Sequence, residues 1–150
     1  MDGEGRTQLF EVMPTVGHLI EVADDEVPFE VNRRFQYLVE SGLMKFERSV
    51  EESPEFVAMI RFSDAHRPAT FALPLLVDAF PPTTVKLGLF GWAPTLELTV
   101  HGRARPSSNW LTARLRMRYL IDGFFEEDCE LWDESGRLVA QSRQLGKVPG

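Results

Sequence analysis

Several stretches of the chain combine aromatic and β-branched residues, and three of the later ones alternate apolar and polar residues with a period of two. Both patterns are typical of half-buried β-strands. Two early stretches, residues 29–40 and 55–64, predict strands by composition. Four later stretches are separated by turn signals and also predict strands: residues 95–105, 109–120, 124–132 and 137–148. We therefore expect about six strands that pair antiparallel.

One short helix is predicted among these strands. The run FALPLLVDAF, from Phe71 to Phe80, is almost wholly apolar and ends before Pro81 and Pro82, which cannot continue a helix. Pro74 fits only in the first turn, where amide groups are still free. One helix and about six strands define an α+β domain in which a single antiparallel sheet wraps around a central helix.

Two hairpin turns predict the register of the last three strands. Ile121-Asp122-Gly123 suits a three-residue loop with a left-handed glycine, which would set Leu120 opposite Phe124. The same register sets three arginines opposite three carboxylates: Arg118 and Glu126, Arg116 and Asp128, Arg114 and Glu130. This arginine stripe could clamp the phosphates of a nucleotide-bearing substrate, but its carboxylate partners favour a solvated outer face.

The second turn, Asp133 to Gly136, suits a four-residue loop. It would pair Leu131 with Leu138, Cys129 with Ala140, Glu127 with Ser142, and Phe125 with Gln144. Alternation then turns Leu138, Ala140, Ser142 and Gln144 toward the helix. Gln144 is therefore predicted to face inward.

Asp78 is the one charge in the predicted helix. A helix that is apolar on every side belongs in the middle of a fold, so we expect Asp78 to be at least partly buried. An unpaired buried carboxylate costs several kcal/mol, and it must find hydrogen bonds or a raised pKa. The expected partners are Gln144, Ser142 and Glu127.

Composition limits the class of protein. A chain of 150 residues with 43% hydrophobic content can fill one core. We divide it into a lead-in, residues 1–26, and one domain, residues 27–150. The net charge of -7 argues against nonspecific binding to nucleic acid or to anionic lipid. The N-terminus matches neither a signal peptide nor a membrane span, and the single cysteine, Cys129, indicates a reducing compartment, which we expect to be the cytoplasm.

Three segments occur in a characteristic order and spacing: LVDAFPP (76–82), GWAPTLELTVHGRARP (91–106) and FFEEDCELWDESGRLVAQSRQLGKVP (124–149). Together they resemble the C-terminal half of the acyl-CoA thioesterase II family, which has the hotdog fold, and the resemblance covers roughly residues 54–149. In that family an aspartate, a threonine and a glutamine hold the water that hydrolyses the thioester. The resemblance implies that Asp78, Thr95 and Gln144 take these roles.

Such a site fits thioester hydrolysis. Water attacks the carbonyl, so a base must take a proton and polar groups must hold the water in place. Asp78 is the expected base, and Thr95 and Gln144 are expected to orient the water. Alternation, however, turns Thr95 away from the helix unless a twist or bulge at the strand start re-aims it. No covalent nucleophile and no cofactor is expected.

The length of the chain bears on its assembly. Family members typically carry two hotdog units with the site between them, whereas 150 residues leave room for one. We therefore expect a homodimer or a higher even oligomer in which each Asp78 faces the partner.

Two other functions remain open. One is a noncatalytic hotdog that binds an acyl or CoA ligand or acts as a partner subunit. The other is a hydroxyacyl thioester dehydratase, which would need a histidine near the helix. His18, His66 and His101 all lie elsewhere, without a metal-binding or triad motif.

Overall fold

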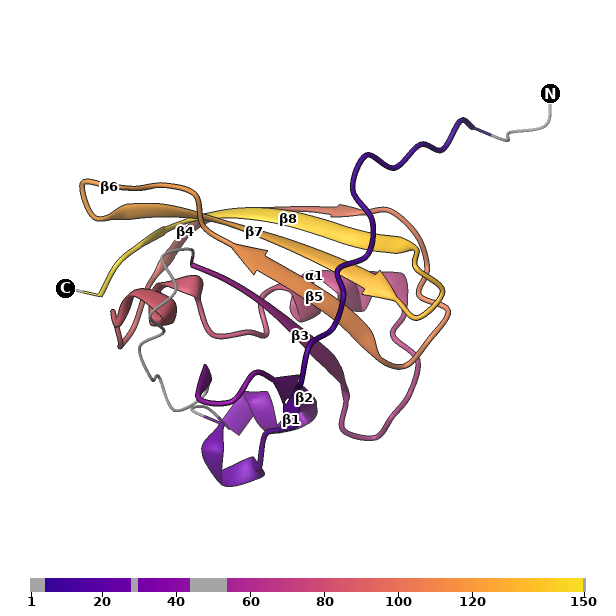
Figure 1. The fold of residues 1–150 in the computed structure, drawn as a ribbon, viewed down its shortest axis with the longest axis horizontal. Helices are drawn as coiled ribbons and strands as arrows, with labels where there is room; N and C mark the ends of the chain where they lie inside the picture. The colour runs from indigo at the N-terminus through magenta and orange to yellow at the C-terminus, as the bar shows by residue number, and fades with distance from the viewer. Residues whose placement is uncertain (1–4, 28–29, 44–53, 150) are drawn as a thin grey trace.

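A single antiparallel sheet curls against one short helix in the computed structural model, which describes residues 5–27, 30–43 and 54–149 (Figure 1). Within these residues the strand order is β1-β2-β3-β5-β7-β8-β4, and β6 pairs with β7. The strands are β1 (Ile20–Glu21), β2 (Phe35–Val39), β3 (Glu55–Phe62), β4 (Thr95–Gly102), β5 (Leu111–Arg116), β6 (Leu120–Ile121), β7 (Phe124–Asp133) and β8 (Leu138–Lys147). Helix α1 lies on one side of the sheet, and the N-terminal segment crosses the other (Figure 1).

The described sheet has eight strands where the sequence predicted about six. The two additional strands, β1 and β6, are two residues long, too short to carry a periodic pattern. The first predicted strand is also shorter than expected, because residues Glu30–Arg34 form a 3₁₀ turn before β2. Phe29, its predicted first residue, lies outside the described residues.

The predicted helix is confirmed but is shorter than its run of apolar residues. Helix α1 spans Leu73–Val77 and follows a 3₁₀ turn at Thr70–Ala72, with Pro74 in its first turn as predicted. Asp78 is its C-cap residue. After Pro81 and Pro82 the chain forms another 3₁₀ turn, η5 (Thr83–Leu87). A further 3₁₀ turn covers Asp24–Glu26.

The first hairpin has a different register from the predicted one near its turn. Gly123 is left-handed as predicted, with φ of 82°, but Asp122 also has a positive φ of 53°. Two such residues form the two-residue turn that fits the twist of a hairpin. Leu120 therefore pairs with Phe125, and its predicted pairing with Phe124 is wrong.

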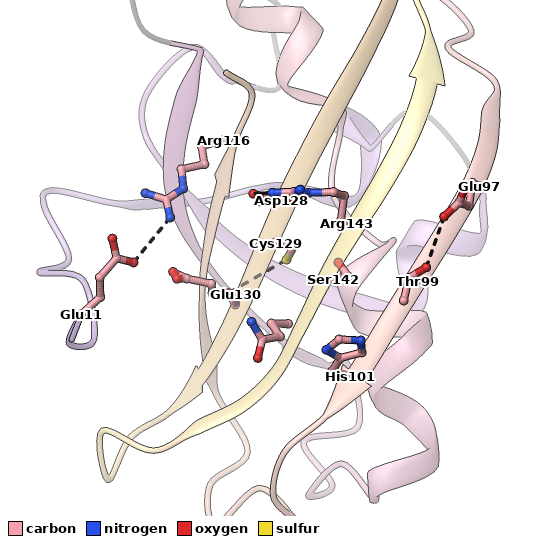
Figure 2. Close-up of a pocket in the computed structure, with 11 residues that line it drawn as sticks. Glu11, Glu97, Thr99, His101, Arg116, Asp128, Cys129, Glu130, Ser142 and Arg143 are labelled. Carbon is pink, nitrogen blue, oxygen red and sulfur yellow. Dashed lines mark hydrogen bonds and ion pairs between the residues drawn. The ribbon is translucent and has the colours of Figure 1, made fainter. Parts of the chain in front are cut away.

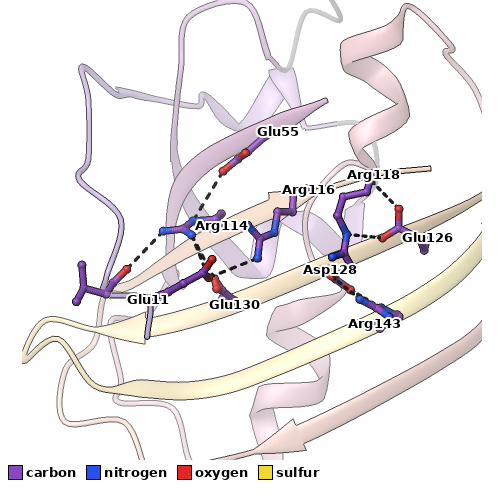
Figure 3. Close-up of polar contacts among 10 residues, drawn as sticks. Glu11, Glu55, Arg114, Arg116, Arg118, Glu126, Asp128, Glu130 and Arg143 are labelled. Carbon is purple, nitrogen blue, oxygen red and sulfur yellow. Dashed lines mark hydrogen bonds and ion pairs between the residues drawn. The ribbon is translucent and has the colours of Figure 1, made fainter. Parts of the chain in front are cut away.

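The outer-face charge ladder is confirmed at two of its three positions. Arg116 pairs with Asp128 and Arg114 with Glu130, because residues 117–119 leave the ladder and absorb the shift of one residue. Arg118 is not a ladder residue, and its backbone N–H donates to Glu126 Oε1 at 2.6 Å. Figure 3 shows these arginines engaged by carboxylates, including Glu11 from the N-terminal segment. The stripe is a paired, solvated face.

The second hairpin is displaced by two residues from its predicted register. Leu131 pairs with Ala140, Cys129 with Ser142, and Glu127 with Gln144. The Asp133 N–H donates to the Arg137 carbonyl at 3.0 Å, and Gly136 is left-handed, so the turn is a three-residue loop and moves the register by one residue. A bulge at Val139 moves the register by one more residue. A shift of two keeps each side chain on its predicted face. Gln144 therefore faces α1, directly opposite Glu127.

Gly146 shows how tightly this end of the sheet is packed. It lies opposite Phe125, whose ring is 2% exposed, and a Cβ added at Gly146 would lie 2.6 Å from Phe125 Cζ. No side chain fits there without moving the ring. Thr95 pairs with Gly146 on the other side, so this packing also defines the start of β4.

We expect Gly146→Ala to lower the free energy of unfolding by about 1–3 kcal/mol, the usual cost of overpacking a core. Urea unfolding followed by tryptophan fluorescence measures it. Gly17→Ala is the matched control, because nothing lies within 4 Å of a Cβ there. Equal midpoints for the two variants would contradict the packing at Gly146.

Candidate active site

The backbone beside Asp78 is fixed by a buried tyrosine. The Tyr37 hydroxyl donates to the Ala79 carbonyl at 2.7 Å and accepts from Asn32 Nδ2 at 2.9 Å. Burial raises the pKa of Tyr37 to about 12, so the hydroxyl keeps its proton and remains a donor. The Phe80 ring packs edge-on against Tyr37. Asp78 is thereby held at a defined point after α1.

The Asp78 carboxylate faces open space in the single chain. Its side chain is exposed, which differs from the expected burial, although the protein on one side still raises its pKa by desolvation. Among the described residues none donates a hydrogen bond to it, so the predicted partners Gln144, Ser142 and Glu127 are wrong in that role. The physical reason is that the Gln144 amide donates to Glu127, while Asp78, at the C-terminal end of α1, is exposed.

Thr95 and Gln144 are brought together. Thr95 pairs with Gly146 while Glu97 pairs with Leu145, so Leu96 is an extra residue that forms a bulge at the start of β4. The bulge turns Thr95 to the face of Gln144, where its Oγ1 donates to Gln144 Oε1 at 2.9 Å. Simple alternation gives the opposite face for Thr95, and the bulge corrects it.

Glu127 is a buried carboxylate at the centre of this cluster. Its side chain is 3% exposed, and it accepts from Gln144 Nε2 at 2.9 Å. The backbone N–H and the hydroxyl of Thr83 donate to its other oxygen at 2.6 and 2.8 Å. Burial raises the pKa of Glu127, the charge of Asp78 adds to the rise, and the three hydrogen bonds oppose it. The sequence analysis named Glu127 only as a possible partner of Asp78. The donors to Glu127 come from segments far away in the sequence, so no local pattern pointed to its central position.

Asp78 joins this cluster through charge rather than through a hydrogen bond. Its carboxylate is close enough to raise the pKa of both Glu127 and Cys129. Helix α1 contacts β4, β7 and β8, which carry Thr95, Glu127 and Gln144. Hydrogen bonds thus link Thr95 and Gln144 to Glu127, and the charge of Asp78 acts on the same Glu127.

Cys129 behaves as a small buried hydrophobe. It is 2% exposed, and burial raises the pKa of its thiol well above the ordinary value. Such a thiol stays protonated and unreactive.

A groove of about 490 Å³ lies on the opposite side of the sheet (Figure 2). It is lined mostly by side chains that alternate with the helix-facing ones, among them Thr99, His101 and Arg143, and by Glu11. Four carboxylates and two arginines line it, and both arginines are paired with carboxylates of the groove. The groove is separate from Asp78, Thr95 and Gln144.

The edge of the sheet next to the candidate site is apolar and uncovered. β4 is the last strand in the sheet order, and Leu98 on its helix-facing side is exposed. Leu75 of α1, which contacts β4, is 47% exposed. Large apolar side chains are thus exposed on α1 and on the edge strand β4.

The fold is that of the hotdog proteins. A protein with the hotdog fold from Alicyclobacillus acidocaldarius superposes with a TM-score of 0.81 at 24% identity, covering 98% of this chain and 58% of that one. A candidate thioesterase II from Thermobifida fusca superposes with a TM-score of 0.82 at 32% identity, covering all of this chain and 59% of that one. In the described residues, no helix is long and apolar enough to cross a membrane.

Residues 11–148 match the family described as the acyl-CoA thioesterase C-terminal domain. The chain belongs to this family, which confirms the resemblance seen in the sequence. An uncharacterized protein of Mycobacterium tuberculosis is 41% identical over 81 residues, which is 54% of this chain and 28% of that protein. The chain thus spans less than two-thirds of the length of these relatives.

Two adjacent threonines test the bonding of Glu127. Thr83→Val removes a donor to a buried carboxylate and should lower the free energy of unfolding by about 1.5–3 kcal/mol at neutral pH. The loss should shrink as the pH falls through the raised pKa of Glu127, because a protonated carboxyl gains less from the donor. Urea unfolding at several pH values measures both effects.

The control is Thr84→Val. Thr84 is equally buried, but its hydroxyl has no hydrogen-bond partner among the described residues. Its loss should leave stability unchanged or improve it. A larger loss at Thr84 than at Thr83 would show that the bonds to Glu127 are not the stabilising ones.

Proposed function

We propose that this protein hydrolyses acyl-CoA thioesters with a water activated by Asp78 and positioned by Thr95 and Gln144. The hydrogen bond from Thr95 to Gln144, formed on the side of the sheet that α1 contacts, supports the proposal most directly. Membership of the acyl-CoA thioesterase family supports the substrate class. The single cysteine is consistent with a reducing compartment such as the cytoplasm.

In the proposed reaction, the water oxygen attacks the thioester carbonyl carbon while Asp78 takes one water proton. The tetrahedral intermediate then collapses, and the carbon–sulfur bond breaks. The leaving thiolate takes the proton back from Asp78, which yields a carboxylic acid and free CoA thiol. The partial desolvation that raises the pKa of Asp78 makes it a stronger base than a fully solvated aspartate.

We propose that a second hotdog unit completes the site. Asp78 is exposed in the single chain, and the uncovered apolar side chains Leu75 and Leu98 lie on α1 and on the edge strand β4. An exposed strand edge pairs readily with another strand, and a two-fold dimer is the commonest closed assembly. A covered Asp78 would lose more water, and its pKa would rise further.

The test of the reaction is Asp78→Asn. Steady-state release of free thiol from a panel of acyl-CoA substrates should show kcat reduced by about 10²- to 10⁴-fold, the usual contribution of a general base. For the unaltered chain, kcat/KM should rise with pH through the raised pKa of Asp78, because only the carboxylate acts as a base. Unchanged unfolding and circular dichroism would show that the fold is intact.

An unaltered kcat in Asp78→Asn would remove Asp78 from the mechanism. Saturable acyl-CoA binding without turnover, across all chain lengths, would instead favour a noncatalytic ligand-binding hotdog.

Assembly is tested by light scattering at micromolar concentration. We expect a mass of twice 17.1 kDa or an even multiple of it. Leu98→Lys, which places a charge on the exposed edge strand, should shift the mass toward 17.1 kDa and reduce activity together. Thr99→Lys, on the opposite side of the same strand, is the control. A stable monomer with full activity would contradict a shared site.

A further inference from the structure

Thr95, Gln144 and Glu127 form a chain of hydrogen bonds in which every donor points toward Glu127. Thr95 Oγ1 donates to Gln144 Oε1, and Gln144 Nε2 donates to Glu127 Oε1. The chain ends at Glu127, whose other oxygen already accepts two bonds from Thr83. An ionised carboxylate can only accept. Glu127 therefore determines which way round the Gln144 amide must lie.

The direction of this chain fixes what Thr95 offers to a neighbouring water. Since its hydroxyl hydrogen is used on Gln144 Oε1, Thr95 presents only lone pairs on its free side. A water between Thr95 and Asp78 would then donate one hydrogen to each. Its own lone pairs would remain free to attack the thioester carbon.

We propose that Glu127 is a positioning residue that sets the donor–acceptor sense of the Gln144 amide and, through it, that of the Thr95 hydroxyl. This inference rests on the proposed hydrolysis for its effect on rate, but the amide orientation can be tested without it. Thr83 assists, because its two donors hold the Glu127 carboxylate in place from a segment that follows the helix. Glu127 touches neither substrate nor water in this scheme.

Glu127→Gln tests the proposal with a side chain of the same shape. The Thr83 donors would hold the oxygen of the introduced amide, and the NH₂ group of that amide would face Gln144. The Gln144 amide must then turn over and point its own NH₂ group at Thr95, which releases the Thr95 hydrogen toward the water. We expect kcat to fall about 10- to 100-fold with KM little changed, the size of effect seen when a residue that orients a direct ligand is lost.

Glu130→Gln is the matched control. Glu130 lies on the same strand, is partly buried and is paired with Arg114, but it faces the outer side of the sheet. Its kcat should stay within about two-fold of the unaltered protein, as expected for a partly solvated ion pair of small net energy. If Glu127→Gln folds normally and keeps kcat as Glu130→Gln does, the positioning role is overturned.

Exchanging the Glu127 carboxylate and the Gln144 amide distinguishes a positioning role of Glu127 from an effect on stability alone. In the double variant Glu127→Gln with Gln144→Glu, the amide introduced on β7 donates its NH₂ group to the carboxylate introduced on β8. That carboxylate again accepts from the Thr95 hydroxyl. The original direction of the chain is restored, so kcat should exceed that of Glu127→Gln alone. A double variant that folds and is no more active than the single one would count against the proposal.

The amide itself gives a readout that needs no activity. In the ¹⁵N NMR spectrum of the unaltered chain, one Gln144 side-chain hydrogen should be shifted downfield and exchange slowly, because it is bonded to a buried carboxylate. Glu127→Gln should move this signal and Glu130→Gln should not. A Gln144 amide that exchanges like a free one would overturn the proposal even where no thioester is hydrolysed. Absence of hydrolysis with the downfield signal present would remove the proposed function alone.

Discussion

The buried carboxylate of Glu127 is the interaction on which the candidate site depends. It receives donors from the turn that follows the helix and from the last strand, two segments far apart in the sequence. A carboxylate at 3% exposure is costly unless its lone pairs are filled. The requirement for three donors therefore fixes Thr83 and Gln144 in position, and Gln144 in turn fixes Thr95. The side chains of the candidate site are therefore held in place by the hydrogen bonds that one buried carboxylate requires.

Two neighbouring carboxylates have different surroundings in this arrangement. Glu127 is enclosed and bonded, whereas the Asp78 side chain is exposed and its carboxylate accepts no hydrogen bond from the described residues. The charge of Asp78 raises the pKa of Glu127, because like charges in a low dielectric repel, whereas the pKa of Asp78 is raised by desolvation. A free carboxylate with a raised pKa is suited to accept a proton, and a bonded one is suited to hold its neighbours still. Leu75 and Leu98, which the proposed second hotdog unit would cover, are exposed in this chain.

The geometry of the candidate site depends on two positions whose side chains take no part in it. Gly146 allows the Phe125 ring to lie against the backbone, and the same stretch of β8 carries Gln144. The bulge at Leu96 then turns Thr95 to the correct face. The site thus depends on one missing side chain and one extra residue, neither of which takes part in any chemistry.

The sequence by itself determined the fold class, the position of the helix and the inward face of Gln144, because these depend on local composition and on a period of two that survives a register shift of two. It also indicated Asp78, Thr95 and Gln144 through their motifs. The exact register at both hairpins, the bulge that re-aims Thr95 and the enclosure of Glu127 were decided only by the tertiary structure. Each depends on backbone dihedral angles at single residues or on donors from distant segments, and no local pattern encodes which distant groups will meet.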